Sequence, residues 1–359
     1  MTRPADALHR GRAATGNPVN RFHSVHSEAV DDGWSGEAEP PRLATTLGVD
    51  CSRSVISYNQ SPDVPFDRSI NPYRGCEHGC IYCFARPTHA WLDLSPGLDF
   101  ETRLFYKPDA VEQLRSELAR PSYRCAPLAV GANTDAYQPV ERRLQLTRAI
   151  LGVLAETAHP CVIITKSSLI ERDLDVLVRL AEQGLVQVRV SLTTLDRELA
   201  RRMEPRAAAP QRRLEVIRRL RAAGVPVGVL AAPVVPVLTD PELERLLATA
   251  REAGAESAGY ILMRLPHEVK SLFRDWLQAH YPQRAAHVMN AVRDTRGGRE
   301  NDPRFGMRQS GSGVLAAMIA DRFRLAVRRL GFPGHDELNC GAFRSPGAVV
   351  QPDLFGPAG

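Results

Sequence analysis

The stretch NPYRGCEHGCIYCFARPTHAWL, residues 71–92, places Cys76, Cys80 and Cys83 within a single short loop. A structural zinc site takes four ligands, usually as two separated pairs. Three thiolates can instead bind three irons of a cubane cluster and leave the fourth iron open for a small molecule. The spacing therefore favours a cluster completed by a cofactor. The alternatives are three unrelated thiols, or a zinc site completed by His78 or His89.

On both sides of this loop, short apolar runs alternate with amphipathic helical periods. The strand candidates are a short segment just before the cysteines and residues 127–132, 161–166, 186–192, 225–234 and 259–265. The helical candidates between and after them include residues 139–156, 173–184 and 240–255. Unbroken Val, Ile and Leu runs are typical of parallel strands buried on both faces. About six βα units of this kind predict an α/β fold, either an open doubly wound sheet or an incomplete barrel.

Composition divides the chain into three expected regions. Residues 1–60 are rich in Gly, Pro, Ser and charges, which predicts an extended or disordered N-terminal segment. Residues 61–270 form the expected core, and residues 271–359 a helical C-terminal extension and tail. The sequence contains no run of about 18 apolar residues and therefore predicts no membrane span. The N-terminus lacks the apolar centre of a secretory signal. We therefore expect a cytoplasmic protein, in which seven cysteines indicate metal or redox chemistry rather than disulfides.

The cysteine spacing and its flanks resemble the radical S-adenosylmethionine (SAM) superfamily, and more narrowly the proteins related to spore photoproduct lyase, often labelled DNA repair photolyases. The motifs that carry the resemblance are NPYRGCEHGCIYCFARPTHAWL, NTDAYQPVE, IITKS and LDRELARRMEPRAAAPQRRL. The resemblance implies a partial (β/α)6 TIM-type barrel and a [4Fe-4S] cluster on the three cysteines. It also implies cleavage of SAM to a 5′-deoxyadenosyl radical that abstracts hydrogen from a substrate. A reducing partner such as flavodoxin or ferredoxin would supply the electron.

Further positions are implied as cofactor contacts by the same resemblance. Tyr82 stands where the superfamily usually has an aromatic residue, and the implied SAM contacts after the next strands are Asn133, Thr134, Asp135, Lys166 and Ser191. Two alternatives remain open. The residues 133–141 could serve only as a helix entrance, and Lys166 could pair with a neighbouring acid such as Glu171.

The substrate is left open by the sequence. Residues 201–221 hold eight arginines against two glutamates, which indicates either a nucleic-acid-binding patch or a solvated helix face with Arg–Glu pairs. The resemblance favours a nucleic-acid lesion or base, but it places Ala132 where the lesion-repairing lyase has a hydrogen-donating cysteine. Cys340 is the tail thiol that could approach the site instead. The alternatives are radical modification of a protein or small metabolite, and a non-catalytic iron–sulfur or zinc module that binds nucleic acid.

Overall fold

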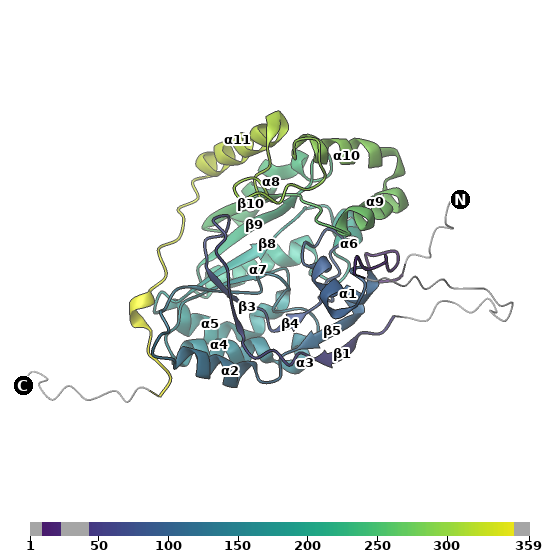
Figure 1. Cartoon of the computed structure of the whole chain (residues 1–359). Coiled ribbons are helices and arrows are strands. Elements are labelled where there is room, and N and C mark those ends of the chain that lie inside the picture. Colours follow the sequence, from purple (N-terminus) through teal and green to yellow (C-terminus); the bar gives the residue numbers. More distant parts are fainter. Residues whose placement is uncertain (1–8, 23–42, 348–359) are drawn as a thin grey trace, which may run out of the picture.

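Six parallel strands form the centre of the computed structural model, which describes residues 9–22 and 43–347 (Figure 1). They are β3 (Arg68–Ile70), β6 (Leu128–Val130), β7 (Cys161–Thr165), β8 (Val186–Ser191), β9 (Val227–Val234) and β10 (Ser257–Leu262). They lie side by side in chain order, β10-β9-β8-β7-β6-β3, and β2 (Ile56–Tyr58) adds an antiparallel strand beyond β3. The partial (β/α)6 barrel expected from the resemblance is confirmed.

Amphipathic helices cover the outer face of this sheet. They are α2 (Ala110–Leu118), α4 (Leu146–Glu156), α5 (Leu174–Ala181), α7 (Pro210–Ala222) and α8 (Leu243–Glu252), with α6 (Arg197–Met203) and the short helices η2 (Ser168–Asp173) and η3 (Asp240–Glu242) at strand ends. Their apolar stripes and the outward strand residues form one core of Val, Leu and Ile side chains. Burial of this apolar surface drives the helices onto the sheet. The inner face of the sheet is left to line a cavity.

One helical period is divided where the sequence predicted a continuous helix over residues 139–156. Gln145 adopts a left-handed φ of 55° and separates α3 (Glu141–Leu144) from α4. The Glu141 carboxylate accepts a hydrogen bond from the Thr147 amide at 3.0 Å, which satisfies a free N–H in the first turn of α4. Leu144 of α3 packs with Leu146 against Tyr73 and Leu104, whereas Ile150 and Leu154 of α4 pack in the main core.

A second, three-stranded sheet was not predicted from the sequence. It contains β1 (Thr46–Val49), β5 (Arg103–Tyr106) and β4 (Tyr73–Arg74) in the order β1-β5-β4. The helices η1 (Arg86–Leu92) and α1 (Leu98–Thr102) connect the cysteine loop to β5. Of the segment 1–60 that we expected to be extended or disordered, residues 9–22 and 43–60 pack here or on the barrel edge. Residues 1–8 and 23–42 lie outside the described residues.

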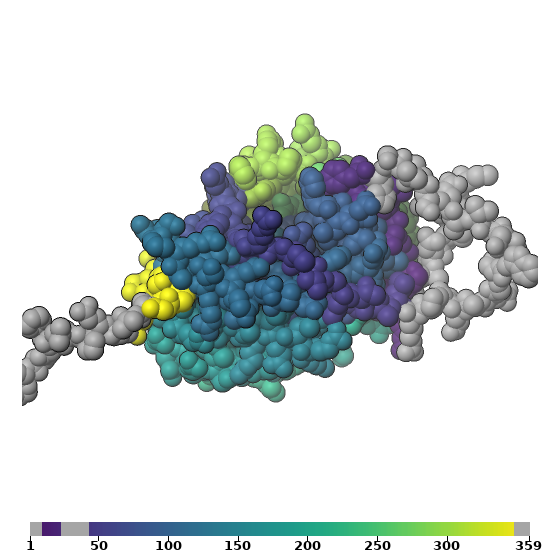
Figure 2. All heavy atoms as spheres, turned by 60° about the horizontal axis from the view of Figure 1, so that its bottom comes forward, coloured from purple at the N-terminus to yellow at the C-terminus, as the bar shows by residue number. Residues whose placement is uncertain are grey.

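The C-terminal region is helical, as expected, and then returns across the barrel. Helices α9 (Val269–His280), α10 (Pro282–Asp294) and α11 (Gly313–Leu330) follow β10, and a tail containing η4 (Cys340–Ala342) runs back to α4, where the Arg344 amide donates to the Thr157 carbonyl at 2.8 Å. Figure 2 shows this yellow segment against the blue and teal part of the molecule. Within the described ranges no helix is long and apolar enough to cross a membrane.

Candidate functional site

The inner face of the half-barrel and the loops above it enclose a cavity of about 1250 Å³. Its wall includes the thiols and polar side chains that the sequence singled out, namely Cys76, Cys80, Cys83, Asp135, Lys166 and Ser191. The cysteines come from the loop after β4, and the others stand at the carboxyl ends of successive parallel strands. Ligands collect at this end of α/β sheets because the strand-following loops meet there.

Two glycines shape the cysteine loop. Gly75 and Gly79 have φ values of 76° and 65°, in the left-handed region that favours glycine. A Cβ on Gly79 would lie 2.7 Å from the Glu101 carboxylate, so the loop is pressed against that side chain. The Cys76 amide donates to the Phe100 carbonyl at 2.9 Å, which fixes the first cysteine to the end of α1.

A buried ion pair supports the same loop from behind, and sequence reasoning missed it. Arg86 and Glu101 are fully buried and 2.5 Å apart. The Arg86 guanidinium also donates to the carbonyls of Gly79 and Cys80, each at 2.8 Å. Glu101 in turn accepts from the amide of Ala14 at 3.0 Å. The signal available in the sequence was only an arginine three residues after the last cysteine.

The three thiols suit a multi-iron cluster better than a single metal ion. Within residues 9–22 and 43–347, no three His, Cys, Asp or Glu side chains converge on a point that could hold one ion. Burial raises the pKa of Cys76 well above its usual value, and the neighbouring charges of Asp135, Cys80 and Cys83 raise it further. Burial and Glu204 raise the pKa of Cys80 to about 12. A cationic cluster compensates closely spaced, desolvated thiolates of this kind.

The two histidines of the zinc alternative are engaged elsewhere. His78 Nδ1 lies 3.3 Å from the Asp135 carboxylate. His89 is buried against Phe100, and its Nε2 lies 2.9 Å from the Arg103 carbonyl oxygen. Burial lowers the pKa of His89 to about 4. Among the described residues, neither ring converges with the thiols on a point that could hold one metal ion.

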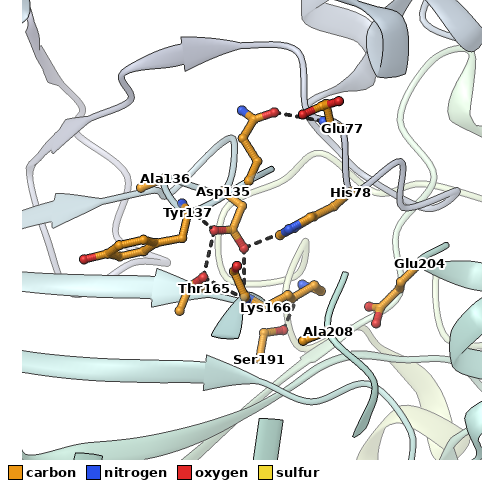
Figure 3. Close-up of polar contacts among 12 residues, drawn as sticks. Glu77, His78, Asp135, Ala136, Tyr137, Thr165, Lys166, Ser191, Glu204 and Ala208 are labelled. Carbon is orange, nitrogen blue, oxygen red and sulfur yellow. Dashed lines mark hydrogen bonds and ion pairs between the residues drawn. The ribbon is translucent and has the colours of Figure 1, made fainter. Parts of the chain in front are cut away.

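Asp135 joins the cysteine loop to the end of β7 (Figure 3). Its carboxylate accepts hydrogen bonds from Thr165 Oγ1 at 2.7 Å and from the Lys166 amide at 2.6 Å, and it faces His78. Burial raises the pKa of Asp135, but the charge of His78 and the hydrogen bonds outweigh it and hold the pKa at about 2. Asp135 is thus ionised and connects its own loop after β6 to the cysteine loop and to the end of β7. It also lines the cavity.

Lys166 projects from the end of β7 over the cavity. Its Nζ donates to Ser191 Oγ at 2.9 Å and lies 6.0 Å from the centre of the Tyr82 ring. The alternative partner, Glu171, pairs instead with Arg212 at 2.5 Å and Arg219 at 3.0 Å. No carboxylate forms an ion pair with Lys166 among the described residues, so its ammonium remains able to receive an anionic group.

Glu204 lies behind Tyr82 and was also missed by sequence reasoning. The fully buried carboxylate accepts hydrogen bonds from the Tyr82 hydroxyl, from Thr193 Oγ1 at 2.7 Å and from Arg213. Burial raises the pKa of Glu204, but Arg213 and Lys166 outweigh it and lower the pKa to about 2. The charge is therefore retained and fixes the tyrosine beside the thiols.

Of the two remaining residues expected to contact SAM, Asn133 lines the cavity and Thr134 does not. Asn133 is exposed and lines the cavity. Thr134 is buried away from the cavity wall and donates to the Tyr73 carbonyl at 2.8 Å. Ala132 lines the cavity, and Cys340 reaches it from the tail. Asn133 therefore shares the cavity with the cysteines and Lys166, whereas Thr134 serves the loop backbone.

The arginines of residues 201–221 are mostly paired with carboxylates. Arg213 and Glu204 form a buried pair, and the others with ion pairs in the described structure are Arg202, Arg206, Arg212, Arg218, Arg219 and Arg221. The pairing favours the solvated helix face over an uncompensated phosphate-binding patch, because the acidic partners neutralise much of the local charge.

A comparison with known protein families identifies the superfamily of the chain. The radical SAM superfamily matches residues 70–250, which span the cysteine loop and the strands β6 to β9. The chain belongs to the radical SAM superfamily. Radical SAM enzymes act through SAM and a [4Fe-4S] cluster, and these are the cofactors of this chain.

Two relatives and one fold neighbour extend the comparison. The chain is 41% identical to Uncharacterized protein Rv2578c of Mycobacterium tuberculosis over 65% of this chain and 69% of that protein. It is 24% identical to Uncharacterized protein MJ0683 of Methanocaldococcus jannaschii over 60% of this chain and 76% of that protein. Spore photoproduct lyase complexed with dinucleoside spore photoproduct has the same fold, with a TM-score of 0.57, 18% identity, and 84% and 85% of the two chains covered.

Proposed function

We propose that Cys76, Cys80 and Cys83 hold the [4Fe-4S] cluster of a radical SAM enzyme whose core spans residues 61–270 and whose substrate enters the 1250 Å³ cavity. The observation that carries the proposal is the shared cavity wall, on which the three thiols face Lys166 and Ser191. When bound, cluster and SAM supply a 5′-deoxyadenosyl radical that abstracts hydrogen from the substrate.

The polar groups at the strand ends would hold the amino-acid part of SAM. Lys166 is a cation without a carboxylate partner in the described structure, so it suits the methionine carboxylate. Asp135 keeps Lys166 and the cysteine loop at a fixed separation through its bonds to both segments. Asn133 adds an exposed side-chain amide on the same cavity wall. Tyr82 is oriented by Glu204 and covers the thiol side of the cavity.

A half-barrel lined by apolar side chains excludes water from reactive groups. The inner strand residues Val162, Ile164 and Leu230 give the cavity this character. A flavodoxin- or ferredoxin-like partner would deliver the electron at the exposed side of the cysteine loop. Cys83 is the partly exposed member of the three and lines the cavity.

Two substrate classes are compatible with this chemistry. The likeness in fold to spore photoproduct lyase supports a nucleic-acid lesion or base. The paired arginines of residues 201–221 favour a protein or small metabolite, and so does Ala132 on the cavity wall, which the resemblance matches to the donor cysteine of the lesion-repairing lyase.

An anaerobic turnover assay tests the proposal. The full chain is reconstituted with iron and sulfide, reduced with dithionite and mixed with SAM, and 5′-deoxyadenosine is measured by mass spectrometry. We expect product from the native chain and none from Cys80→Ala. A Cys125→Ala chain is the matched control, because Cys125 lies outside the cysteine loop, and it should retain activity.

The same samples discriminate the non-catalytic module. An iron–sulfur module that only binds nucleic acid would show no change in its paramagnetic spectrum when SAM is added, and a zinc module would show no such spectrum. A full cluster with neither spectral change nor 5′-deoxyadenosine would refute the enzyme proposal.

A further inference from the structure

The floor of the cavity carries a charge that the proposed SAM chemistry does not use. Arg189 lies on β8 two residues before Ser191 and lines the same cavity. Side chains two apart on a strand point to the same face, and a strand rises about 3.3 Å per residue. Arg189 therefore stands about 7 Å deeper in the half-barrel than the end of β8 where Ser191 meets Lys166.

Among the described residues, the hydrogen bonds of the Arg189 guanidinium go only to neutral groups. Its Nη1 donates to Ser257 Oγ on β10, and its Nη2 lies 3.5 Å from Gln187 Oε1. No carboxylate forms an ion pair with it within residues 9–22 and 43–347. Burial lowers its pKa, yet arginine keeps its charge in proteins. A half-buried cation without an ion-pair partner is costly unless an anion joins it.

The sheet is built to leave room for this side chain. Gly228 on β9 lies between Arg189 and Ser257, and a Cβ on Gly228 would stand 2.5 Å from Arg189 Nη1. The guanidinium can therefore cross β9 only because that position is glycine. A residue with any side chain there would displace the cation from the cavity floor.

The C-terminal tail crosses below the cavity next to Arg189. Gln187 Nε2 donates to the Asp336 carbonyl at 2.7 Å, and the Asn339 amide donates to the Gly184 carbonyl at 3.0 Å. Glu337, Leu338 and Cys340 of this tail line the cavity, and no ion pair joins Glu337 to Arg189 within the described residues. The tail closes the cavity below Arg189. A ligand that enters from the thiol side therefore ends at Arg189, as a small molecule can, whereas a continuous polymer would need an exit on the far side.

We propose that Arg189 binds a terminal anionic group of the substrate, a carboxylate or a phosphate monoester, which makes the substrate a small organic anion held inside the half-barrel. This inference rests on the proposed function for the identity of the site. The guanidinium offers a planar fork that matches either oxyanion. The opposite end of such a molecule would then lie toward the thiols and Lys166.

A second arginine on the cavity wall provides the competing assignment. Arg264 lies beside Cys83, with its guanidinium 4.6 Å from the centre of the Phe84 ring and no hydrogen bond in the described part of the chain. The third arginine, Arg308, is already paired with Asp63 at 2.5 Å. An anion could thus bind at the rim instead of the floor, and the experiment separates the two.

Calorimetric titration tests the assignment. Inorganic phosphate and acetate are titrated separately into the anaerobically reconstituted full chain at constant ionic strength, without reductant. We expect one site for at least one anion, weakened at least tenfold in Arg189→Gln, which corresponds to about 1.4 kcal/mol. Tighter binding of phosphate would identify the terminal group of the substrate as a phosphate monoester, and tighter binding of acetate would identify it as a carboxylate. The matched control is Arg201→Gln, which removes the same charge from an exposed site on α6 and should leave both titrations unchanged.

A second variant guards against misfolding of Arg189→Gln. Gly228→Ala keeps the charge but displaces the guanidinium, so it should weaken the anion as well. Unchanged binding in both variants, loss only in Arg264→Gln or only in Lys166→Gln, or no binding to the native chain would each overturn the proposal. Because SAM is not cleaved in this titration, its result is independent of the 5′-deoxyadenosine assay, and either proposal can fail alone.

Discussion

At the scale of single residues, Glu204 gathers three donors around one buried carboxylate. Arg213, Tyr82 and Thr193 all donate to it, and Arg213 is itself buried. Replacing Glu204 by Gln keeps the shape but leaves the Arg213 charge unpaired in the core. Breaking a buried ion pair in this way costs about 3–5 kcal/mol. We expect that loss in the free energy of unfolding of Glu204→Gln, measured by urea denaturation.

The matched control for this change is Glu215→Gln on α7. Glu215 pairs with Arg218 and Arg219 in solvent, where both partners remain hydrated after the change. Its unfolding free energy should stay within error of the native value. Equal destabilisation by the two substitutions would show that the buried network around Glu204 contributes nothing specific.

Gly79 is the residue on which the shape of the cysteine loop depends most directly. Gly79→Ala forces a left-handed φ of 65° on alanine and places its Cβ 2.7 Å from Glu101. We expect the loop to shift and the iron and sulfide content after reconstitution to fall by at least half. Gly224→Ala is the control, because it has a similar φ of 79° with nothing within 4 Å. It should cost about 1–2 kcal/mol of stability and keep the full cluster content.

At the scale of elements, what the sequence could predict depended on periodicity. The runs at 161–166 and 186–192 became β7 and β8 almost residue for residue, because β7 is a short, mainly apolar run and the valines of β8 alternate with polar residues, and both are local patterns. β1 and β4 were missed because each is short and stabilised by β5, a partner distant in sequence. Long-range pairing of this kind leaves no signal within a short window.

In the candidate site, too, residues with a local sequence signal were predicted and residues that depend on distant partners were not. Cys76, Cys80 and Cys83 were singled out from their spacing, and all three line one cavity. Arg86 and Arg189 were not found, because a buried arginine is recognised only when its neighbours in space are known. Their partners, Glu101 and Ser257, stand 15 and 68 residues away along the chain.

Two elements at opposite edges of the sheet are joined across the open side of the barrel. The loop after β2 contributes Asp63, and the loop before α11 contributes Arg308 and the Gly306 amide, each 2.5 Å from the Asp63 carboxylate. We expect a coupling energy of about 2 kcal/mol between Asp63→Asn and Arg308→Gln in a double-mutant cycle. Hydrogen exchange in residues 59–66 should rise in either single variant.

The control for the Asp63–Arg308 contact is an Arg–Asp ion pair within a single helix, which connects no separate elements. Arg324 and Asp321 pair on the exposed surface of α11. Arg324→Gln should leave exchange in residues 59–66 unchanged. A coupling energy near zero between Asp63 and Arg308 would mean that the two sheet edges are held together by packing alone.

At the scale of the whole molecule, buried histidines tie stability to pH. His159 is fully buried between Tyr123, whose hydroxyl lies 2.6 Å from its Nε2, and Phe343 of the C-terminal tail. Burial lowers the pKa of His159 to about 4, from a usual value of 6.5, and the Arg68 charge acts in the same direction. The folded chain therefore holds this ring neutral, while the unfolded chain protonates it below about pH 6.5.

The sign of the pH dependence follows from that difference. The unfolded state binds more protons between pH 6.5 and about 4, so the stabilising contribution of neutral His159 is present above pH 6.5 and is lost as the pH falls toward 4. The slope can reach one proton, about 1.4 kcal/mol per pH unit. We expect urea unfolding at pH 7, 6 and 5 to show this decline, and His159→Gln to flatten it by up to one proton. The exposed His287→Gln should keep the native slope, and a His159→Gln slope equal to that of the native chain would contradict the assignment.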